Sequence, residues 1–485
     1  MDAAQIRSLR PRLKSFLKKF DDCFLRSDTR GHLRTYMCGQ LSDLPRKNCE
    51  PIADAAQMPP RTLQQFLNLL DWNHGLMRTK LQKLVAREHA SPHSVGIIDE
   101  TGCPKKGEKT PGVQLQWCGV LGKKENCVVT VHLAYAVNDF HCLLDSELFL
   151  PESWSNDRPR CQAAHIPDDM THRTKPQIAL ELYDRARSNG VVFEWLTFDE
   201  LYGHNREFLA ALRQRQQKYV AEVPVTLTGW VQSPRITHRT YRKCLHYGSV
   251  RKTPRCVQGT PPPLSVREHL CSSPELRDQP WQKFRIKDGE KGPQVWEAKH
   301  VWFFPQDGHE LPLEPAHLIV ARNVFEPEQI KFFIAHAPRE TSLTVLLWVA
   351  FARWRVERCF EDQKTELGFD HFEGRSYVGL MRHQIITALT HLFLSRVHQQ
   401  WREKKSGADG LPIADSLVGP GSILVSSGPG GPGASDANSP DHHRHPGSQS
   451  PLSPQSSQTN AATTPCPPDI PHKDSEMRME KELAL

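Results

Sequence analysis

The stretch SVGIID, residues 94–99, is the strongest fold signal in this chain of 485 residues. It is a short apolar, β-branched run that ends in an acid, Asp99, and such a run is typical of a strand buried in a sheet. A second run of this kind, VVFEWLTFD at residues 191–199, ends in Asp199. If these strands are parallel neighbours, their carboxyl ends open into one crevice, where ligands of open α/β sheets bind.

The sequence around these two runs predicts a small mixed sheet with helices packed against it. Further apolar runs alternate with segments of helical periodicity, and Gly190 is suited to end the first helix. The predicted order is β-β-β-α-β-α-β. Its elements are the strands 94–99, 114–120, 127–137, 191–199 and 218–225 and the helices 174–190 and 205–217.

The regions outside this sheet differ in composition and predict a division into domains. Helical periodicity returns after residue 340, whereas residues 226–340 hold Pro, Arg, Trp and short β-like runs. Beyond Trp401 there is no aromatic residue, and a tail rich in Gly, Pro and Ser cannot bury enough apolar surface to order itself. We expect a helical domain at 1–90, a catalytic core at 91–225, a β-rich insertion at 226–340, core helices at 341–400 and a disordered tail at 401–485.

The positive charge of the chain is concentrated at its N-terminus. Residues 1–90 contain 16 Lys and Arg against 9 Asp and Glu, a surplus equal to the +7 of the whole chain. This basic segment suggests contact with nucleic acid, although a solvated helical domain would look similar. Within it, a helix over 50–57, the break Met58-Pro59-Pro60 and a second helix opening at Thr62 resemble a DNA-binding helix-turn-helix or a plain helical hairpin.

The sequence predicts a protein of a reducing cytoplasm without a membrane span. The longest apolar stretch, 343–352, is about half of what a bilayer requires, and the N-terminus lacks the apolar core of a signal peptide. The 13 Cys form no CxxC pair, so we expect free thiols. A weaker alternative is a zinc site, whose ligand types are present at Cys244, His246, Cys256, His269 and Cys271, although their spacing matches no common finger.

Two carboxylates at the ends of adjacent strands repel each other unless a cation lies between them, and oxygen ligands select Mg²⁺ or Mn²⁺. The alternative for Asp99 and Asp199 is that they are solvated caps of their strands. The next acids along the chain, Glu100 and Glu200, should point to the opposite face if the strands continue.

A late helix around RWRVERCFEDQK adds a third acid. Arg353, Glu357 and Lys364 share one helical face, because seven residues at about 100° each return to nearly the same direction. Such a carboxylate can join a metal site while the cations contact phosphate oxygens. The alternative is an ordinary amphipathic helix with an Arg353–Glu357 pair. Glu361 lies on the same face and is a second candidate for the third ligand.

Three blocks, IDETGCPKKG, TFDELYG and RWRVERCFEDQKTELGFDHFEGRS, resemble the catalytic blocks of DDE transposases, the bacterial insertion-sequence enzymes with a ribonuclease H-like core. The closest branch carries Tyr-x2-Arg-x3-Glu-x6-Lys in its third block. Arg353, Glu357 and Lys364 fit this spacing, and Ala350 stands at the Tyr position, where a hydroxyl near a phosphate is lost. The resemblance covers about residues 30–398.

This resemblance implies a ribonuclease H-like mixed sheet, split between the second Asp and the Glu by the β-rich insertion. It also implies that Asp99, Asp199 and Glu357 are the metal ligands. They would hold two Mg²⁺ ions, for which Mn²⁺ can substitute, that promote hydrolysis at the transposon ends and strand transfer into target DNA.

The resemblance also implies contacts with double-stranded DNA, namely the terminal inverted repeats and the target. Arg353 and Lys364 would clamp phosphates. Lys105 and Lys106 would do the same, with a solvated lysine pair as an equal alternative. Relatives act as dimers on DNA, and we expect a homodimer associated with the nucleoid. Some relatives stack a flipped base on an aromatic residue of the insertion, for which Trp230, Trp296 and Trp302 are candidates unless they belong to the core.

Other functions use parts of the same pattern. A metal-dependent nuclease of the same fold would share the site chemistry, and a catalytically impaired DNA-binding remnant would explain Ala350. A glycosidase using two of the acids needs neither the basic N-terminus nor the flanking Arg and Lys, and is disfavoured.

Overall fold

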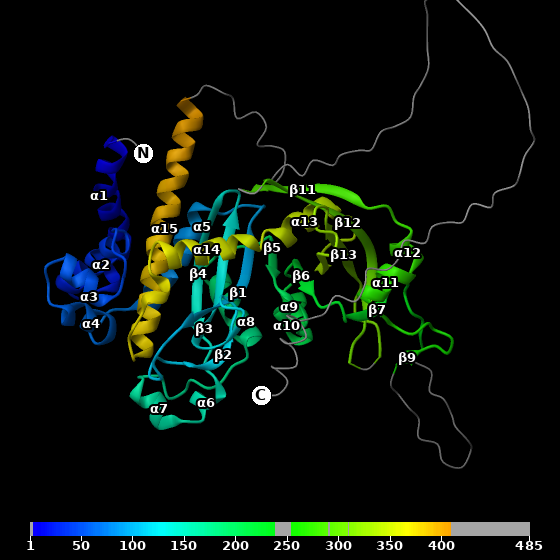
Figure 1. The fold of residues 1–485 in the computed structure, drawn as a ribbon, viewed down its shortest axis with the longest axis horizontal. Coiled ribbons are helices and arrows are strands. Elements are labelled where there is room, and N and C mark those ends of the chain that lie inside the picture. Colours follow the sequence, from blue (N-terminus) through cyan, green and yellow to red (C-terminus); the bar gives the residue numbers. More distant parts are fainter. Residues whose placement is uncertain (1–2, 238–253, 290–291, 309, 409–485) are drawn as a thin grey trace, which may run out of the picture.

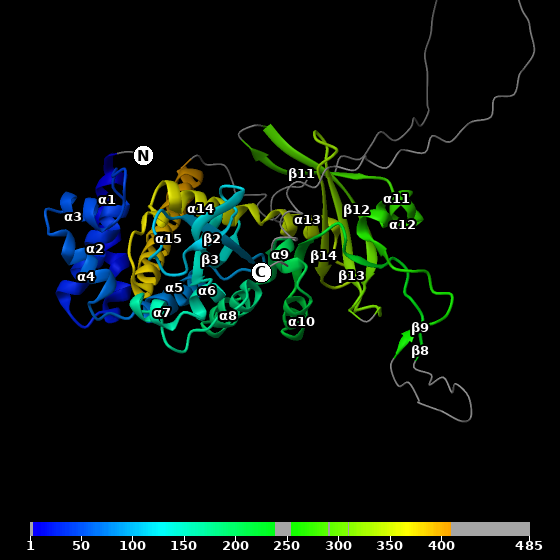
Figure 2. The same cartoon turned by 60° about the horizontal axis from the view of Figure 1, so that its bottom comes forward.

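The computed structural model describes residues 3–237, 254–289, 292–308 and 310–408. A helical region at one end, a central sheet with helices, and a β-rich region at the other end follow each other across the molecule (Figures 1 and 2). Of the predicted tail, residues 401–408 belong to the last helix, which corrects the expectation of disorder there, and the rest lies outside the described residues.

The N-terminal residues fold into helices that pack their apolar faces together. These elements are α1 (Ala3–Leu17), the 3₁₀ segment η1 (Lys18–Cys23), α2 (Ser27–Gln40), α3 (Cys49–Ala55), α4 (Pro60–Asn68) and α5 (His74–Glu88). The two helices predicted around the Met58-Pro59-Pro60 break are confirmed as α3 and α4. Pro60 opens α4, where its missing N–H costs no hydrogen bond.

The apolar face of α4 is covered by the last helix, α15 (Tyr377–Ala408). Phe66 is fully buried and stacks on Trp72 with ring centroids 5.2 Å apart. Arg382 of α15 donates to the carbonyl groups of Phe66, Leu67 and Trp72. The opposite face of α4 exposes Arg61.

The central sheet contains the parallel pair of strands that the sequence predicts. Its strands are β1 (Val95–Pro104), β2 (Gln114–Cys118), β3 (Lys123–Val137), β4 (Phe140–Leu148), β5 (Trp195–Phe198) and β6 (Tyr219–Val223). The register of β1 and β5 runs from Val95↔Trp195 to Ile98↔Phe198. Strand β3 pairs with β1 and β4, both antiparallel, and β6 lies parallel to β5. Strand β4 is absent from the predicted order.

Helices lie between β4 and β6 in the chain. They are α6 (Glu152–Ser155), α7 (Arg158–Ala163), α8 (Lys175–Ser188), α9 (Glu200–Gly203) and α10 (Arg206–Gln214). Among them, α8 and α9 pack against the sheet. Helix α8 confirms the predicted helix over 174–190. It begins with a capping box between Thr174 and Gln177, and Gly190 follows it with a left-handed φ of 88°.

The region predicted as β-rich forms strands that extend the central sheet. The elements are β7 (Thr228–Trp230), β8 (Ile236–Thr237), β9 (Arg255–Cys256), β10 (Leu264–Ser265), α11 (Val266–Ser272), α12 (Pro274–Arg277), β11 (Gln282–Gly289), β12 (Gly292–Pro305), β13 (Ala316–Asn323) and β14 (Ile330–His336). Strand β14 pairs antiparallel with β6, so the sheet order is β10-β7-β12-β13-β14-β6-β5-β1-β3-β2. Strands β8 and β9 form a separate pair.

The long helical run predicted after residue 340 is broken into α13 (Leu343–Phe351) and α14 (Trp354–Thr365). The short 3₁₀ segment η2 (Phe369–His371) precedes α15. Arg353 lies at the break, immediately before α14.

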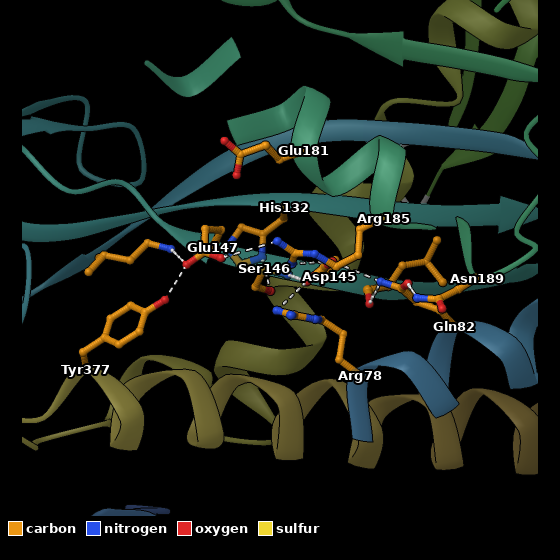
Figure 3. A network of polar contacts seen from close by, with 12 residues as sticks. Arg78, Gln82, His132, Asp145, Ser146, Glu147, Glu181, Arg185, Asn189 and Tyr377 are labelled. Atoms are coloured by element: carbon orange, nitrogen blue, oxygen red, sulfur yellow. Dashed lines mark hydrogen bonds and ion pairs between the residues drawn. The ribbon is translucent and has the colours of Figure 1, made fainter. Parts of the chain in front are cut away.

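A buried polar network attaches β4 to the surrounding helices (Figure 3). The Asp145 carboxylate is fully buried between Arg185 of α8, 3.0 Å away, and Arg78 of α5, 3.5 Å away. Glu147 accepts a 2.8 Å hydrogen bond from the Tyr377 hydroxyl of α15. Burial raises the pKa of Asp145, and the two arginines oppose this shift.

Most of the described cysteines are free thiols. Ten described cysteines are free, but Cys271 is disulfide-bonded, so the expectation of free thiols was wrong for this residue. Of the residues named for a zinc site, His269 hydrogen-bonds Ser273 and Gly229, and Cys244 and His246 lie outside the described residues.

Within the described ranges, no helix combines the length and apolarity needed to cross a bilayer.

Candidate active site

Asp99 and Asp199 follow directly on the last paired residues of two parallel strands. Ile98 pairs with Phe198, so the two acids occupy equivalent positions at the carboxyl end of the pair. Strand β5 ends there, and Asp199 becomes the N-cap of α9 by accepting a 3.0 Å hydrogen bond from the Leu201 N–H. The predicted juxtaposition of the two strand ends is therefore present.

Glu357 reaches the same place from α14, through Arg353. One guanidinium nitrogen of Arg353 lies 3.0 Å from Asp99 Oδ2 and the other lies 2.8 Å from Glu357 Oε1. Burial lowers the pKa of Arg353, but these two carboxylates outweigh it and hold the pKa above its usual value. The guanidinium group of Arg353 thus forms ion pairs with two of the three predicted acids.

All three acids line one open cavity of about 770 Å³. Arg353 and Lys364 line it as well, and Lys364 donates to the Thr101 hydroxyl at 2.6 Å. The face of α14 predicted from the sequence is therefore turned toward β1.

The raised pKa of Asp99 indicates that the negative charge of the cavity exceeds its positive charge around this carboxylate. Burial raises its pKa most, the nearby Asp199 and Glu100 raise it further, and Arg353 lowers it without cancelling the shift. The donors are carboxylate oxygens, which are the ligands that Mg²⁺ and Mn²⁺ prefer. The residues present therefore fit divalent cations at this cavity.

The two lysines that follow the first acid do not line the cavity. The Lys105 ammonium donates to the carbonyl oxygens of Asp370, at 2.8 Å, and Phe372, at 2.7 Å. This favours a structural role, in which Lys105 fastens the loop after α14 to the end of β1. Lys106 is exposed.

Glu100 and Glu200 both line the same cavity, so the expectation that Glu100 points away is wrong, whereas for Glu200 its condition, a continuing strand, is not met. Strand β5 stops at Phe198, so Glu200 belongs to α9 and the alternation of a strand no longer applies. Because β5 ends at Phe198, β1 has no parallel partner from β5 beyond Ile98. Glu100 fills this space, bound by Lys175 at 3.2 Å and by the Tyr202 hydroxyl at 2.9 Å.

Glu361, the second candidate for the third ligand, also lines the cavity. Its side chain is about as exposed as that of Glu357, but it pairs with Arg358 at 3.0 Å. Glu357 is the acid that Arg353 connects to Asp99. The geometry therefore favours Glu357.

The sequence did not predict a further ion pair in the cavity wall. Glu222 of β6 and Lys331 of β14 line the cavity and are 2.7 Å apart. A single acid inside the apolar run over 218–225 was the available signal for Glu222. Lys331 had no such signal, because its place depends on the pairing of β14 with β6.

A smaller cavity of about 310 Å³ adjoins the first, since Arg353, Glu357, Glu222 and Lys331 line both. Ala350 and Trp296 lie in its wall. The other two tryptophans named above are engaged elsewhere. Trp230 donates to the Pro261 carbonyl, and Trp302 packs edge-on against His317.

Residues 19–293 match the family described as DDE superfamily endonuclease. The match covers more than half of the chain and includes Asp99 and Asp199. The chain belongs to this family. The resemblance stated from the three sequence blocks is thereby confirmed, and membership of the DDE superfamily implies the use of divalent metal ions.

The DDE superfamily match ends before Glu357, so the assignment of the third acid rests on the geometry of α14. This DDE superfamily member is also 32% identical over 189 residues to a protein of Microchaete diplosiphon described as a probable transposase for insertion sequence element IS701. That similarity covers 38% of this chain and 46% of the relative. The chain therefore matches less than half of the length of this relative.

Proposed function

We propose that this protein is the transposase of an insertion sequence, and that Asp99, Asp199 and Glu357 are its catalytic acids. The observation that carries the proposal is their convergence on one cavity from two parallel strands and a distant helix. Magnesium ions, when bound there, would activate a water or a DNA 3′-hydroxyl and stabilise the leaving oxygen. Such a site cuts the transposon end and later joins its 3′-hydroxyl to target DNA.

Arg353 and Lys364 are the proposed phosphate ligands. Arg353 spans Asp99 and Glu357 with two separate nitrogens. The guanidinium fork has a geometry that suits two phosphate oxygens, while Asp99 and Glu357 would hold the cations. Lys364, at the cavity wall, supplies a second positive charge, and the exposed Lys106 remains a candidate at the rim.

The strand arrangement supports a ribonuclease H-like core. Three antiparallel strands, β4, β3 and β1, are followed in space by β5 and β6, which run parallel to β1. We assign this core to residues 91–225 and 341–400, with the insertion at 226–340 and a helical DNA-binding domain at 1–90. Trp296 lies in the wall of the adjoining cavity, but it is buried and packs against Phe351, which favours the core role over that of a platform for a flipped base.

The proposed substrate is double-stranded DNA, bound by a homodimer that holds two transposon ends in the cytoplasm at the nucleoid. The surplus of basic residues in 1–90 supports the electrostatic part of this binding. Helix α4 exposes Arg61 on the face opposite its buried apolar residues, as expected for a helix that enters a DNA groove.

The test uses the full chain and DNA from the borders of its coding region, where inverted repeats are sought. We expect Mg²⁺-dependent nicking at the repeat ends, supported also by Mn²⁺. Asp99→Asn, Asp199→Asn and Glu357→Gln should each abolish nicking, while Glu361→Gln on the same helix should retain most of it. Nicking that survives in all three variants would refute the assignment.

Two alternatives remain within this experiment. Strand-transfer products with short target duplications identify a transposase, whereas cleavage alone identifies a nuclease of the same fold. Ala350 motivates the other alternative, a remnant that binds DNA without cutting it. Because Ala350 lies in the wall of the adjoining cavity, Ala350→Tyr places a hydroxyl near Arg353 and should raise the activity of an impaired enzyme.

A further inference from the structure

A second group of ligand-type side chains lies on the other side of α14. Asp362 follows Glu357 by five residues, which places it about 140° around the helix from the acid that faces the cavity. Two histidines approach Asp362 from neighbouring elements, His141 from β4 and His391 from α15. Three segments distant in sequence thus each contribute one side chain.

The spacing of these side chains suits an ion between them. Asp362 Oδ2 lies 3.8 Å from His141 Nε2 and 3.8 Å from His391 Nε2, and the three ligand atoms all lie within 4.8 Å of one another. These separations exceed the reach of a hydrogen bond. They are close to the distance of about 3.4 Å that separates two ligands of a tetrahedral zinc ion with bonds of about 2.1 Å.

The surroundings hold the ligand atoms in place and leave a polar group unsatisfied. Arg358 Nε binds the other carboxylate oxygen, Asp362 Oδ1, at 2.9 Å, so Oδ2 remains turned toward the histidines. His391 is only 4% exposed, and its Nδ1 is buried without a hydrogen-bond partner. This nitrogen is not the one that faces Asp362, so the site rests on the spacing of the two Nε2 atoms and Asp362 Oδ2. His141 and Asp362 are partly exposed, which gives an ion access from solvent.

We propose that His141, Asp362 and His391 bind a transition-metal ion of the zinc class, separate from the catalytic magnesium site. Two imidazoles and one carboxylate are ligands that borderline ions such as Zn²⁺ accept, with water in the fourth position. Magnesium is a poor fit, because it prefers oxygen ligands and because Arg358 already offsets the charge of Asp362. The bound ion fastens α14, the helix that carries Glu357, to β4 and α15.

The test is the zinc content of the purified full chain. After treatment with a chelator, the protein is dialysed against micromolar Zn²⁺ with millimolar Mg²⁺, so that Mg²⁺ occupies the carboxylate site. We expect one tightly bound zinc per chain by elemental analysis and a higher melting temperature with zinc than without it. His141→Ala and His391→Ala should weaken zinc binding by more than about 100-fold, since changes to outer-shell residues alone cost 10- to 100-fold.

Two control variants keep the result interpretable. Asp99→Asn removes a ligand of the proposed catalytic site and should leave the zinc content unchanged. His172→Ala should also leave it unchanged, because His172 has Glu152 4.0 Å from its Nε2 and the Leu150 carbonyl on its Nδ1, and belongs to no three-ligand group of the described residues. Since His391→Ala could disturb the core, the decisive variant is His141→Ala, checked for folding by circular dichroism. A folded chain that binds no zinc, or zinc retained by folded His141→Ala, would overturn the proposal.

Discussion

Asp99, one of the three acids that we assign to catalysis, has an environment that disfavours its charged form. Its carboxylate is buried next to Asp199 and Glu100, and its pKa is raised despite Arg353. An acid with a raised pKa binds its proton more tightly in the folded than in the unfolded chain. The stability of the fold therefore falls as pH rises above the unfolded value of about 3.9, and the penalty is present at neutral pH.

We accordingly expect Asp99→Asn to be more stable than the wild type at pH 7 in EDTA. The amide keeps the shape of the side chain and removes the charge that burial opposes. The difference in melting temperature should shrink as pH is lowered toward about 4, where the wild-type acid becomes protonated in both states. Thermal melts across this pH range measure it. Glu361→Gln, at an exposed acid, should leave the melting temperature nearly unchanged, and a less stable Asp99→Asn at pH 7 would contradict the account.

Arg353→Lys tests the guanidinium fork itself. Lysine keeps the charge but, as a point charge, does not span Asp99 and Glu357 or grip two phosphate oxygens. We expect nicking to fall by about 10- to 100-fold, the range seen when a residue that orients metal ligands is lost. Arg187→Lys, on the exposed side of α8, serves as the control. Equal nicking rates for the two variants would remove Arg353 from the site.

The sequence indicated the place of the three acids better than the place of their neighbours. Asp99, Asp199 and Glu357 line one cavity, and each lies in a local segment whose pattern indicates its position. Lys331 and Glu222 meet across 109 residues, through a strand pairing that no local pattern encodes. The resemblance placed Lys105 near phosphates, with a solvated lysine as an equal alternative, but its partners are carbonyl groups of a loop 265 residues further along the chain.

At the level of elements, the short helix α9 fixes where Asp199 lies. A Cβ on Gly203, the last residue of α9, would stand 1.9 Å from the carbonyl oxygen of Glu222. Helix α9 therefore contacts the backbone of β6 directly, and only glycine permits this approach. The N-cap position of Asp199 depends on that contact.

Gly203→Ala should destabilise the fold by about 2–3 kcal/mol, the cost of overpacking a site that cannot relax. It should also lower nicking, because α9 would move away from β6 and take Asp199 with it. Gly31→Ala is the matched control. Gly31 lies within α2 with no atom near its missing Cβ, so alanine should stabilise the protein by up to about 1 kcal/mol. Urea unfolding measures both changes, and a neutral Gly203→Ala would contradict the packing argument.

The elements that sequence reasoning misplaced share a cause. Strand β4 contains Asp145 and Glu147, which look unsuited to a buried strand until Arg78 and Arg185 are brought to them from other elements. The helix over 343–365 shows no Pro or inner Gly, yet it breaks before Arg353. In both places a contact between distant segments outweighs local propensity.

At the level of the whole molecule, the network around Asp145 joins the N-terminal helices to the core. Arg185→Met removes one of the two arginines from a fully buried carboxylate. We expect a loss of about 2 kcal/mol, less than the 3–5 kcal/mol of a fully buried pair because Arg185 is partly exposed. Arg187→Met, two residues along α8 and exposed, should change stability by less than about 0.5 kcal/mol. Equal effects of the two substitutions in urea unfolding would show that the network adds little.

The concentration of positive charge in residues 1–90 leads to a prediction about DNA affinity. Removing one phosphate contact lowers the slope of log affinity against log salt by about 1. We expect Arg61→Ala in α4 to weaken binding to terminal-repeat DNA and to reduce this slope. The exposed Arg187 provides the control substitution, Arg187→Ala. Binding measured by fluorescence anisotropy at several salt concentrations distinguishes this from a general loss of folding, and an unchanged slope would place α4 away from DNA.

The pairing of β14 with β6 has a consequence for how DNA enters. The insertion belongs to the same β-sheet as the strands that carry Asp99 and Asp199, because β14 and β6 pair at five positions, from Phe332↔Val223 to His336↔Tyr219. The insertion cannot rotate against the core without breaking hydrogen bonds of this sheet. We therefore expect the DNA duplex, rather than the protein, to bend where it meets the sheet, at a cost on the order of 1–6 kcal/mol that varies with base sequence. Flexible border sequences would then be cut faster than stiff ones with the same terminal bases.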